Sequence, residues 1–320
     1  MNVFFLAAGL GTRLRPLTNK LPKPCIPFLN VPLGYYQFRF LQNLNISRCV
    51  ANTYHLPLQV EALFKTQTLI KNEVLISAET GTVLGSAGGL KQASKLFGND
   101  ETILMMNSDE VFFTDNSVFI QEALQQHLRN NNLATLVVMK HPQAGQKFGA
   151  IWCDNKSRVQ SIMAANTKPE DDLALTPWHY IGAMLLHKNI LPLIPDGIET
   201  NIFYDVLIKE LDHARVEIFK LDSYWYETGN PSDYLAATTA LLKGLDTNTI
   251  DFINRYDSSH LVQNENGISL VSDSVSVSED KLRGFNVISK SANTQMLNNL
   301  KLIENSIFFE NEVLNLSYFS

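Results

Sequence analysis

Two kinds of apolar pattern alternate along the first half of the chain. Residues 3–8, 102–107 and 134–139 are short and almost continuously apolar, which is typical of strands buried in a parallel sheet. Shorter strand candidates occupy 49–52 and 74–77, and helical apolar spacing appears in 34–44, 58–66, 90–97 and 120–130. This βαβα alternation predicts a doubly wound α/β domain, with ligands at the carboxyl ends of the strands. Gly9 and Asp109 both follow predicted strands at that edge.

The pattern changes near residue 255, where helical spacing fades and short Ser- and Asn-rich apolar alternations begin. They recur at intervals of about six residues, as in a hexapeptide β-helix. A plain β-rich region packed on the first domain fits the same pattern. We therefore expect a domain over 1–250 and a β-rich region over 251–320, either a degenerate left-handed β-helix or a plain sheet. We expect the apolar end, 313–320, either to pack inside the protein or to form a contact between subunits. The second alternative would make the protein a homo-oligomer.

Composition narrows the class of protein. The 320 residues are 45% hydrophobic and 18% charged, as in soluble globular proteins. A net charge of −6 argues against a general nucleic-acid or anionic-membrane binder. Three distant cysteines without a CxxC pair exclude a zinc finger, a redox motif and a disulfide scaffold. The apolar start lacks preceding basic residues, and no stretch approaches ~18 apolar residues, so we expect a cytoplasmic protein without a membrane span.

Charge is distributed unevenly along the chain. The first 60 residues contain six basic residues and no acidic residue, so they carry +6 and the remaining 260 carry −12. This basic segment suggests a local anionic ligand, and chance clustering on a solvated face is the alternative. The six residues are Arg13, Arg15, Lys20, Lys23, Arg39 and Arg48.

A glycine-rich turn lies inside this basic segment, directly after the first predicted strand. The sequence Leu6-Ala-Ala-Gly9-Leu-Gly11-Thr12-Arg13 matches neither the GxGxxG nor the GxxxxGK[ST] phosphate loop. Prolines at 16, 22, 24 and 27 exclude a long helix after it, so we expect an extended loop from which Arg13 and Lys23 project. Two cations on such a loop suit a triphosphate, although Gly-x-Gly alone could be only a tight turn.

These residues resemble a family signature. The segment from Leu6 to Thr18, followed by Pro22-Lys23-Pro24, is similar to the signature of the sugar-1-phosphate nucleotidyltransferases over roughly residues 1–245. The resemblance implies a Rossmann-like mixed sheet and a Mg²⁺-dependent reaction in which a nucleoside triphosphate and a sugar 1-phosphate give an NDP-sugar and pyrophosphate. It assigns nucleotide binding to Leu6, Ala8, Gly9, Gly11, Thr12 and Arg13.

Further segments extend the resemblance. Residues 79–90, which contain Leu84-Gly85-Ser86-Ala87-Gly88, resemble the family's base-binding segment, and this implies nucleotide contacts by Gly85, Ser86 and Gly88. The strand before Asp109 resembles the one that ends in the first metal-binding aspartate. An aspartate after a strand is otherwise more often a turn or cap residue.

The sugar and second metal segments match less well. Gly149, Lys168 and Gly182 resemble sugar-phosphate contacts, but the family usually has Glu before the lysine, where this chain has Thr167. Glu227 stands where the family normally has Asp. Magnesium sites are strict in geometry, so the longer carboxylate either changes the site or disables it. The seven histidines show no triad or metal spacing.

The expected roles follow from the resemblance. Arg13, Lys23 and Asp109 are the catalytic candidates, and Asp109 with Glu227 are the Mg²⁺ candidates. The segment around Gly85 is most similar to mannose-1-phosphate guanylyltransferases, which favours GTP and mannose 1-phosphate. A uridylyltransferase acting on a hexose or amino-sugar 1-phosphate is the alternative. A catalytically silent homologue that binds a nucleotide-sugar and regulates a partner is another.

Overall fold

The computed structural model describes residues 1–170, 174–264, 267–304, 306–309 and 312–315. The chain forms two compact units, and each unit is built from two separate stretches of sequence. The first unit is Met1–Leu10 with Gln37–Trp225, and the second is Gly11–Tyr36 with Tyr226–Ser320. The expected boundary at residue 250 stays a prediction. None of the helices in the described ranges is long and apolar enough to cross a membrane.

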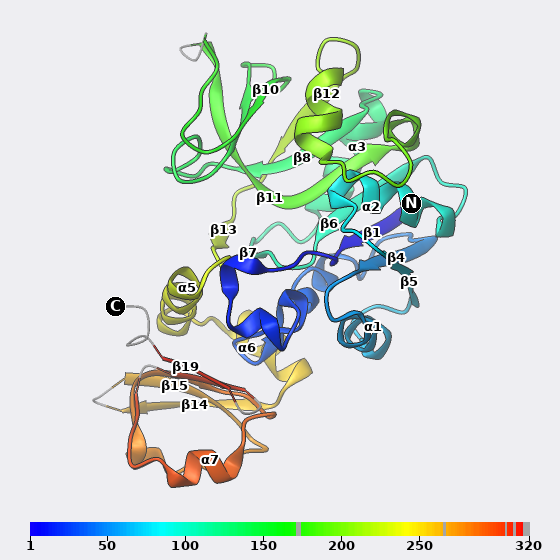
Figure 1. Cartoon of the computed structure of the whole chain (residues 1–320). Coiled ribbons are helices and arrows are strands. Elements are labelled where there is room, and N and C mark those ends of the chain that lie inside the picture. Colours follow the sequence, from blue (N-terminus) through cyan, green and yellow to red (C-terminus); the bar gives the residue numbers. More distant parts are fainter. Residues whose placement is uncertain (171–173, 265–266, 305, 310–311, 316–320) are drawn as a thin grey trace. The chain divides into compact units, whose positions relative to one another are not determined.

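A mixed sheet forms the centre of the first unit (Figure 1). Its parallel part has the order β6-β1-β4-β5, and β11 runs antiparallel to β6. The strand β8 pairs antiparallel with β11 and parallel with β12, whereas the β9–β10 hairpin pairs with the first part of β11. The bounds are β1 (Asn2–Leu6), β4 (Arg48–Thr53), β5 (Val74–Ala78), β6 (Thr102–Asn107), β8 (Ala134–Met139), β9 (Ala150–Cys153), β10 (Val159–Met163), β11 (Thr176–His187) and β12 (Val216–Lys220).

Helices cover both faces of this sheet. Phe4 lies in the main apolar core with Leu90 of α2 (Gly85–Ala93), whereas Phe5 contacts Phe64 of α1 (Pro57–Thr66) with 5.4 Å between ring centroids. Because neighbouring strand residues point to opposite faces, α1 and α2 lie on opposite sides of β1. The doubly wound α/β prediction is therefore confirmed. The remaining elements of this unit are β7 (Val111–Phe113), α3 (Phe119–Arg129), α4 (Ile208–Glu210), the π-helix η9 (Ile202–Leu207), and the 3-10 helices η5 (Phe38–Phe40), η6 (Ser94–Leu96) and η8 (Lys188–Leu193).

Two predicted helices differ from the structure. Residues 34–44 form separate 3-10 helices, η4 (Leu33–Tyr35) and η5, in place of one α-helix. The helix predicted at 90–97 begins earlier, at Gly85, and its last turn is the 3-10 helix η6. Glycines at 85, 88 and 89 hid the start of α2, because glycine lowers helix propensity.

The second unit contains an aromatic core. Phe28 packs edge-on against Tyr36 and Tyr234, and Tyr36 packs against Phe252. This arrangement joins the segment 11–36 to the helices α5 (Pro231–Lys243) and α6 (Thr247–Tyr256). The bounds in this segment are η1 (Thr12–Leu14), η2 (Leu17–Asn19), η3 (Lys23–Cys25), β2 (Pro27–Phe28) and β3 (Val31–Pro32), and β13 (Tyr224–Tyr226) brings the chain back to this unit.

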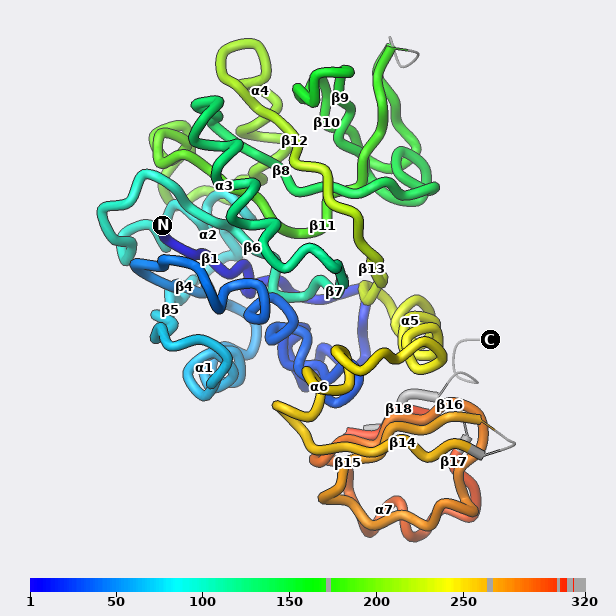
Figure 2. Tube along the Cα trace, turned by 180° about the vertical axis from the view of Figure 1, so that it is seen from behind, coloured from blue at the N-terminus to red at the C-terminus, as the bar shows by residue number. Residues whose placement is uncertain are grey.

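The C-terminal part of the second unit is rich in strands, as predicted. Gly267 of β15 pairs in parallel with Gly284 of β16, and Val287 of β16 pairs in parallel with Ile307 of β18. At the two edges of these parallel strands, β14 pairs antiparallel with β15 and β19 pairs antiparallel with β18. The helix α7 lies across the small apolar core from the strands (Figure 2). The bounds are β14 (Ser259–Asn264), β15 (Gly267–Ser272), η10 (Glu279–Lys281), β16 (Leu282–Ile288), α7 (Thr294–Asn299), β17 (Ile303–Glu304), β18 (Ser306–Phe309) and β19 (Glu312–Asn315). Residues 316–320 of the predicted apolar end lie outside the described residues.

Candidate active site

The carboxyl edge of the first sheet brings together the ends of β1 and β6. Leu6 is opposite Asn107 in the parallel register, and the Ser108 amide donates to the Leu6 carbonyl at 3.1 Å. Gly9 and Asp109 therefore follow neighbouring strands at one edge, as the sequence predicted. A Cβ placed on Gly9 would meet no atom within 4 Å, so the loop is open at this residue. Asp109 is half-buried.

Glu110 is fixed beside the candidate metal ligand Asp109. Its carboxylate accepts hydrogen bonds from the Trp225 indole at 2.7 Å and from the side-chain Nδ2 of Asn107 at 3.4 Å. Gly182 has φ +83°, and a Cβ there would overlap the Glu110 side chain. Gly182 is therefore required by packing at this edge. Burial, and then the charges of Glu110 and Asp109, raise the pKa of the Tyr180 phenol.

A second buried polar cluster lies beneath the start of the glycine-rich loop. The Asn52 Oδ1 accepts from the Ala7 and Ala8 amides at 2.7 and 3.2 Å, and its Nδ2 donates to Glu79 Oε1 at 2.6 Å. The other Glu79 oxygen accepts from the Leu84 amide at 2.8 Å. Burial raises the pKa of Glu79, while the hydrogen bonds from Leu84 and Asn52 oppose that shift.

The predicted base-binding residues pack tightly on the segment 198–202. Cβ atoms on Gly85 and Gly88 would lie 2.7 Å from the Thr200 carbonyl oxygen and 2.6 Å from the Ile198 carbonyl oxygen. Ser86 Oγ accepts from the Ile202 amide at 2.8 Å, and the Ala87 and Gly88 amides donate to the Thr200 carbonyl. These contacts explain the small residues by protein packing, and their nucleotide contacts stay a prediction.

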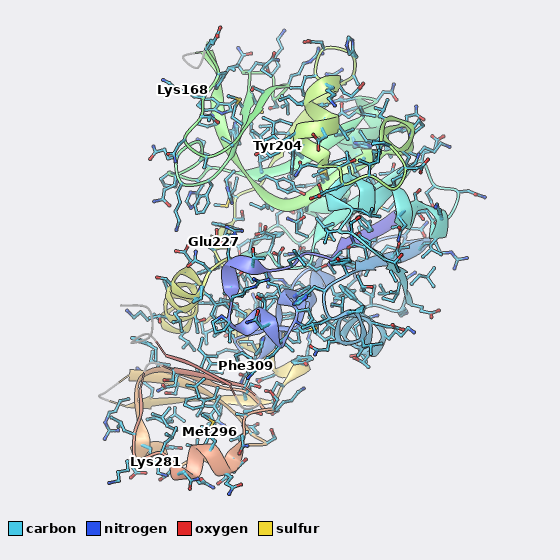
Figure 3. All side chains as sticks on the ribbon, in the orientation of Figure 1. Lys168, Tyr204, Glu227, Lys281, Met296 and Phe309 are labelled. Atoms are coloured by element: carbon cyan, nitrogen blue, oxygen red, sulfur yellow. The ribbon has the colours of Figure 1, made fainter. Side chains whose placement is uncertain are left out.

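Two of the three predicted sugar-phosphate residues, Gly149 and Lys168, flank the β9–β10 hairpin of the first unit, whereas Gly182 lies in β11. Gly149 precedes β9, and a Cβ there would lie 3.0 Å from the Met163 carbonyl oxygen and 3.6 Å from the Tyr204 hydroxyl. Lys168 is exposed in the segment after β10 (Figure 3). Thr167, the departure from the family pattern, donates to the Ala164 carbonyl at 2.6 Å and so stabilises its own turn.

An aromatic cluster lies beside Glu110. His179 contacts Trp225, Phe148 and His141 at centroid distances of 4.3, 5.1 and 5.4 Å. Its side chain is 7% exposed, and neither ring nitrogen has a hydrogen-bond partner among the described residues. Burial lowers the pKa of His179 to about 4, and the charge of His141 adds to the shift. His179 is therefore a neutral ring at pH 7.

The basic loop belongs to the second unit and is compact. Thr12 and Arg13 lie in η1 and Lys23 lies in η3, with η2 between them. The extended loop predicted from the prolines is therefore wrong. The prolines prevent a long helix but not these short turns. Thr18 Oγ1 donates to the Gly11 carbonyl at 2.8 Å, and a Cβ on Gly11 would lie 2.8 Å from the Thr18 methyl. Arg13 is exposed.

Glu227 lies against the same loop within this unit (Figure 3). Its Oε1 accepts from the Gly229 amide at 2.5 Å, and a Cβ on Gly229 would lie 3.2 Å from Arg13 Nη2. The Glu227 carboxylate therefore folds back onto its own backbone beside Arg13. In the described part of the chain, no three His, Cys, Asp or Glu side chains gather as a complete metal site.

Comparison with known proteins identifies the family. The model of a family described as "Nucleotidyl transferase" matches residues 3–244. The chain belongs to the nucleotidyl transferase family. It is 26% identical over 253 residues to a UTP–glucose-1-phosphate uridylyltransferase of Synechocystis sp., covering 76% of this chain and 63% of that protein. It is 29% identical over 256 residues to a mannose-1-phosphate guanyltransferase of Yarrowia lipolytica, covering 77% and 65%.

Solved structures share the nucleotidyl transferase fold. The UDP-glucose pyrophosphorylase from Acinetobacter baumanii superposes with a TM-score of 0.65 at 17% identity, covering 78% of this chain and 96% of that chain. This likeness confirms the Rossmann-like α/β fold. The alignments span less than two thirds of the length of the two sequence relatives above.

Sequence reasoning missed the residues that hold these segments in place. Asn52 had only a weak signal, a polar residue at the end of a predicted strand. Glu79 was named only as the first residue of the segment 79–90, and Glu110 had only its position after Asp109. Their partners come from up to 115 residues away along the chain, as in the Glu110–Trp225 contact. Such long-range pairing cannot be read from local pattern.

Proposed function

We propose that this protein is a sugar-1-phosphate nucleotidyltransferase. The observation that carries the proposal is that the family match, residues 3–244, contains every candidate site residue from Leu6 to Glu227. Supporting it, Gly9 and Asp109 follow adjacent strands in the first unit. In the second unit, Arg13 lies beside the segment that carries Glu227.

The proposed reaction is an in-line displacement at the α-phosphorus. A phosphate oxygen of the sugar 1-phosphate forms the new P–O bond, the α–β bridging bond breaks, and pyrophosphate leaves with its electron pair. A phosphate dianion is already a competent nucleophile, so no general base is required. Catalysis then depends on positioning and charge stabilisation. Arg13 would stabilise charge on the departing β,γ-phosphates, and Lys23 would polarise the α-phosphate.

Asp109 and Glu227 are the proposed magnesium ligands. Magnesium is commonly bound through one or two protein carboxylates together with substrate phosphates, so this donor set fits it without a third protein ligand. When bound, Mg²⁺ would neutralise phosphate charge. Glu110 is a weaker candidate, because Trp225 and Asn107 already occupy its carboxylate. Glu227 keeps one oxygen on the Gly229 amide and would present the other to the ion.

GTP and mannose 1-phosphate are the proposed substrates. The support is the similarity of the segment at Gly85 to mannose-1-phosphate guanylyltransferases and the Yarrowia relative. UTP with a hexose or amino-sugar 1-phosphate is the alternative, favoured by the Synechocystis relative. Thr167 donates to its own turn, where the family usually has an acidic residue, so the usual sugar contact at this position is missing.

The test is pyrophosphate release by purified protein with Mg²⁺. GTP, UTP, dTTP, CTP and ATP are each paired with mannose 1-phosphate and with glucose 1-phosphate, and Lys23→Ala serves as the control. Clear turnover of the GTP–mannose 1-phosphate pair, lost in the control, supports the proposal, while turnover with UTP selects the alternative. Nucleotide-dependent shifts in melting temperature without turnover would instead indicate the silent regulatory homologue. Turnover in Lys23→Ala equal to wild type would refute the role of Lys23.

A further inference from the structure

Two buried polar residues connect two segments of the first unit that are far apart in sequence. Asn52, at the end of β4, is 0% exposed, and Glu79, directly after β5, is 6% exposed. We call them the Asn52–Glu79 pair. Asn52 Nδ2 donates to Glu79 Oε1 at 2.6 Å. No nucleotide contact was assigned to either residue, although Glu79 is the first residue of the segment 79–90 that resembles the family's base-binding segment.

On one side, the pair holds the start of the glycine-rich loop. Asn52 Oδ1 accepts from two consecutive backbone amides, Ala7 at 2.7 Å and Ala8 at 3.2 Å. These contacts fix the backbone direction directly before Gly9. On the other side, Glu79 Oε2 accepts from the amide of Leu84, the residue before α2, at 2.8 Å. The pair therefore sets the position of both segments to which nucleotide contacts were assigned.

The surroundings leave the pair little freedom to move. A Cβ on Gly89 would lie 2.5 Å from Asn52 Nδ2 and 2.7 Å from Glu79 Oε1, so glycine is required there for space. The donors to the Glu79 carboxylate are neutral amides, which hold it in one geometry. A buried carboxylate without a cationic partner is costly for stability. Such a group is better explained by the geometry that it imposes than by the stability that it adds.

We infer that the Asn52–Glu79 pair is a positioning element that couples the glycine-rich loop to the segment before α2 and thereby sets the affinity for the nucleoside triphosphate. The inference rests on the proposed function, because that function gives both segments nucleotide contacts. The pair touches no reacting group, so it acts through the backbone it holds. Disturbing it should weaken nucleotide binding and leave the affinity for the sugar phosphate unchanged.

A double-mutant cycle tests this coupling. Asn52→Asp places two carboxylate oxygens against each other, and Glu79→Gln either places two amide groups against each other or turns a donor toward the Leu84 amide. In Asn52→Asp/Glu79→Gln every hydrogen bond can form again. The new carboxylate accepts from Ala7 and Ala8, the new amide donates to it, and the amide oxygen accepts from Leu84. The net charge stays that of the wild type.

The expected result is a split between the two substrates. Each single variant should raise the KM and the Kd for the triphosphate at least about tenfold, as loss of one buried hydrogen bond would. The sugar-phosphate KM should change less than about twofold, and the double variant should return to within about threefold of wild type. Unchanged triphosphate KM in the single variants, or equal losses for both substrates, would overturn the inference.

A matched control separates positioning from general destabilisation. Asn132 and Glu217 form a similarly buried amide–carboxylate contact at 3.1 Å, and neither belongs to a proposed nucleotide segment. Asn132→Asp should lower the melting temperature without raising the triphosphate KM. A tenfold rise in that control would show that any buried charge change has this effect, and would overturn the inference.

Two further outcomes remain decisive. If a single variant does not fold, Gly89→Ala displaces the pair by a different route, and an unchanged triphosphate KM in that variant would overturn the inference. If the wild type has no turnover, the triphosphate Kd alone is compared among the variants, so the proposed function fails while the inference is still tested. A wild type that neither turns over nor binds nucleotide would refute both.

Discussion

Acid should destabilise the first unit through His179, and the size of the effect follows from the surroundings of this ring. The side chain is 7% exposed, and both ring nitrogens lack a hydrogen-bond partner among the described residues. Burial lowers the pKa of His179 from 6.5 to about 4 in the folded protein. Because the unfolded chain binds the proton more readily, stability is fully present above pH 6.5 and decreases as the pH falls toward 4.

The contribution can be worked out by proton linkage. At pH 5 an unfolded imidazole is almost fully protonated, whereas the folded one is about one-tenth protonated, so this single group removes about 2 kcal/mol from the free energy of unfolding relative to pH 7.5. His179→Phe keeps a ring in contact with Trp225, Phe148 and His141 and removes the titration. The stability difference between pH 7.5 and pH 5 should therefore be about 2 kcal/mol smaller in the variant than in wild type.

Urea unfolding followed by tryptophan fluorescence measures this difference, because all three tryptophans, at 152, 178 and 225, belong to the first unit. Subtracting the pH difference of the variant from that of wild type cancels the groups whose titration the substitution leaves unchanged, including His127, whose pKa burial also lowers to about 4. His213→Phe, at an exposed position of the same unit, is the control. A variant-to-wild-type difference below about 0.5 kcal/mol, or an NMR midpoint for His179 above pH 6, would refute the reasoning.

Three further predictions concern the site. Lys23→Ala should lose about two orders of magnitude in kcat/KM, the usual effect of removing one donor that stabilises transition-state charge, measured by pyrophosphate release. Gly182→Ala should lower the free energy of unfolding by about 2 kcal/mol because of its positive φ alone, and by more because the methyl overlaps Glu110. Gly197→Ala is the control, because its φ is +69° and nothing lies within 4 Å, so it has the strain without the overlap. Equal melting temperatures of the two variants would contradict the packing argument. Glu227→Gln should raise the Mg²⁺ concentration for half-maximal activity about tenfold while Glu227→Asp stays active, and equal Mg²⁺ dependence in both variants would remove Glu227 from the metal site.

Periodic segments were predictable because local pattern and tertiary burial agree in them. The helix expected at 120–130 is found at Phe119–Arg129, and the strand expected at 102–107 has those bounds. The segment 34–44 has equally helical spacing, but its aromatic residues pack in different units. Tyr36 belongs to the aromatic core of the second unit, and Phe38 packs against Phe5 in the first. Tertiary contacts therefore override local preference there, and one sequence cannot reveal this.

In the candidate site, too, some features could be predicted from the sequence and others could not. Motif similarity located the glycine-rich loop, the segment at Gly85 and the carboxylate Asp109, because each is a short contiguous pattern. The sequence could not predict why a particular residue type stands at each position, because the residues that pack against it come from distant parts of the chain. Gly89 is small because Asn52 and Glu79 fill the space beside it, and Gly182 because Glu110 does.

Backbone amides that are already engaged within the protein increase the share of the triphosphate charge that side-chain cations hold in the proposed reaction. Glycine-rich loops commonly bind phosphate through free amides. In this chain the Ala7 and Ala8 amides donate to Asn52, and the Ala87 and Gly88 amides donate to the Thr200 carbonyl. Those four donors, at the end of β1 and the start of α2, are therefore not available to phosphate oxygens. The basic residues at 13 and 23 then contribute to binding and not only to rate, so their alanine variants should weaken triphosphate binding as well as lower turnover.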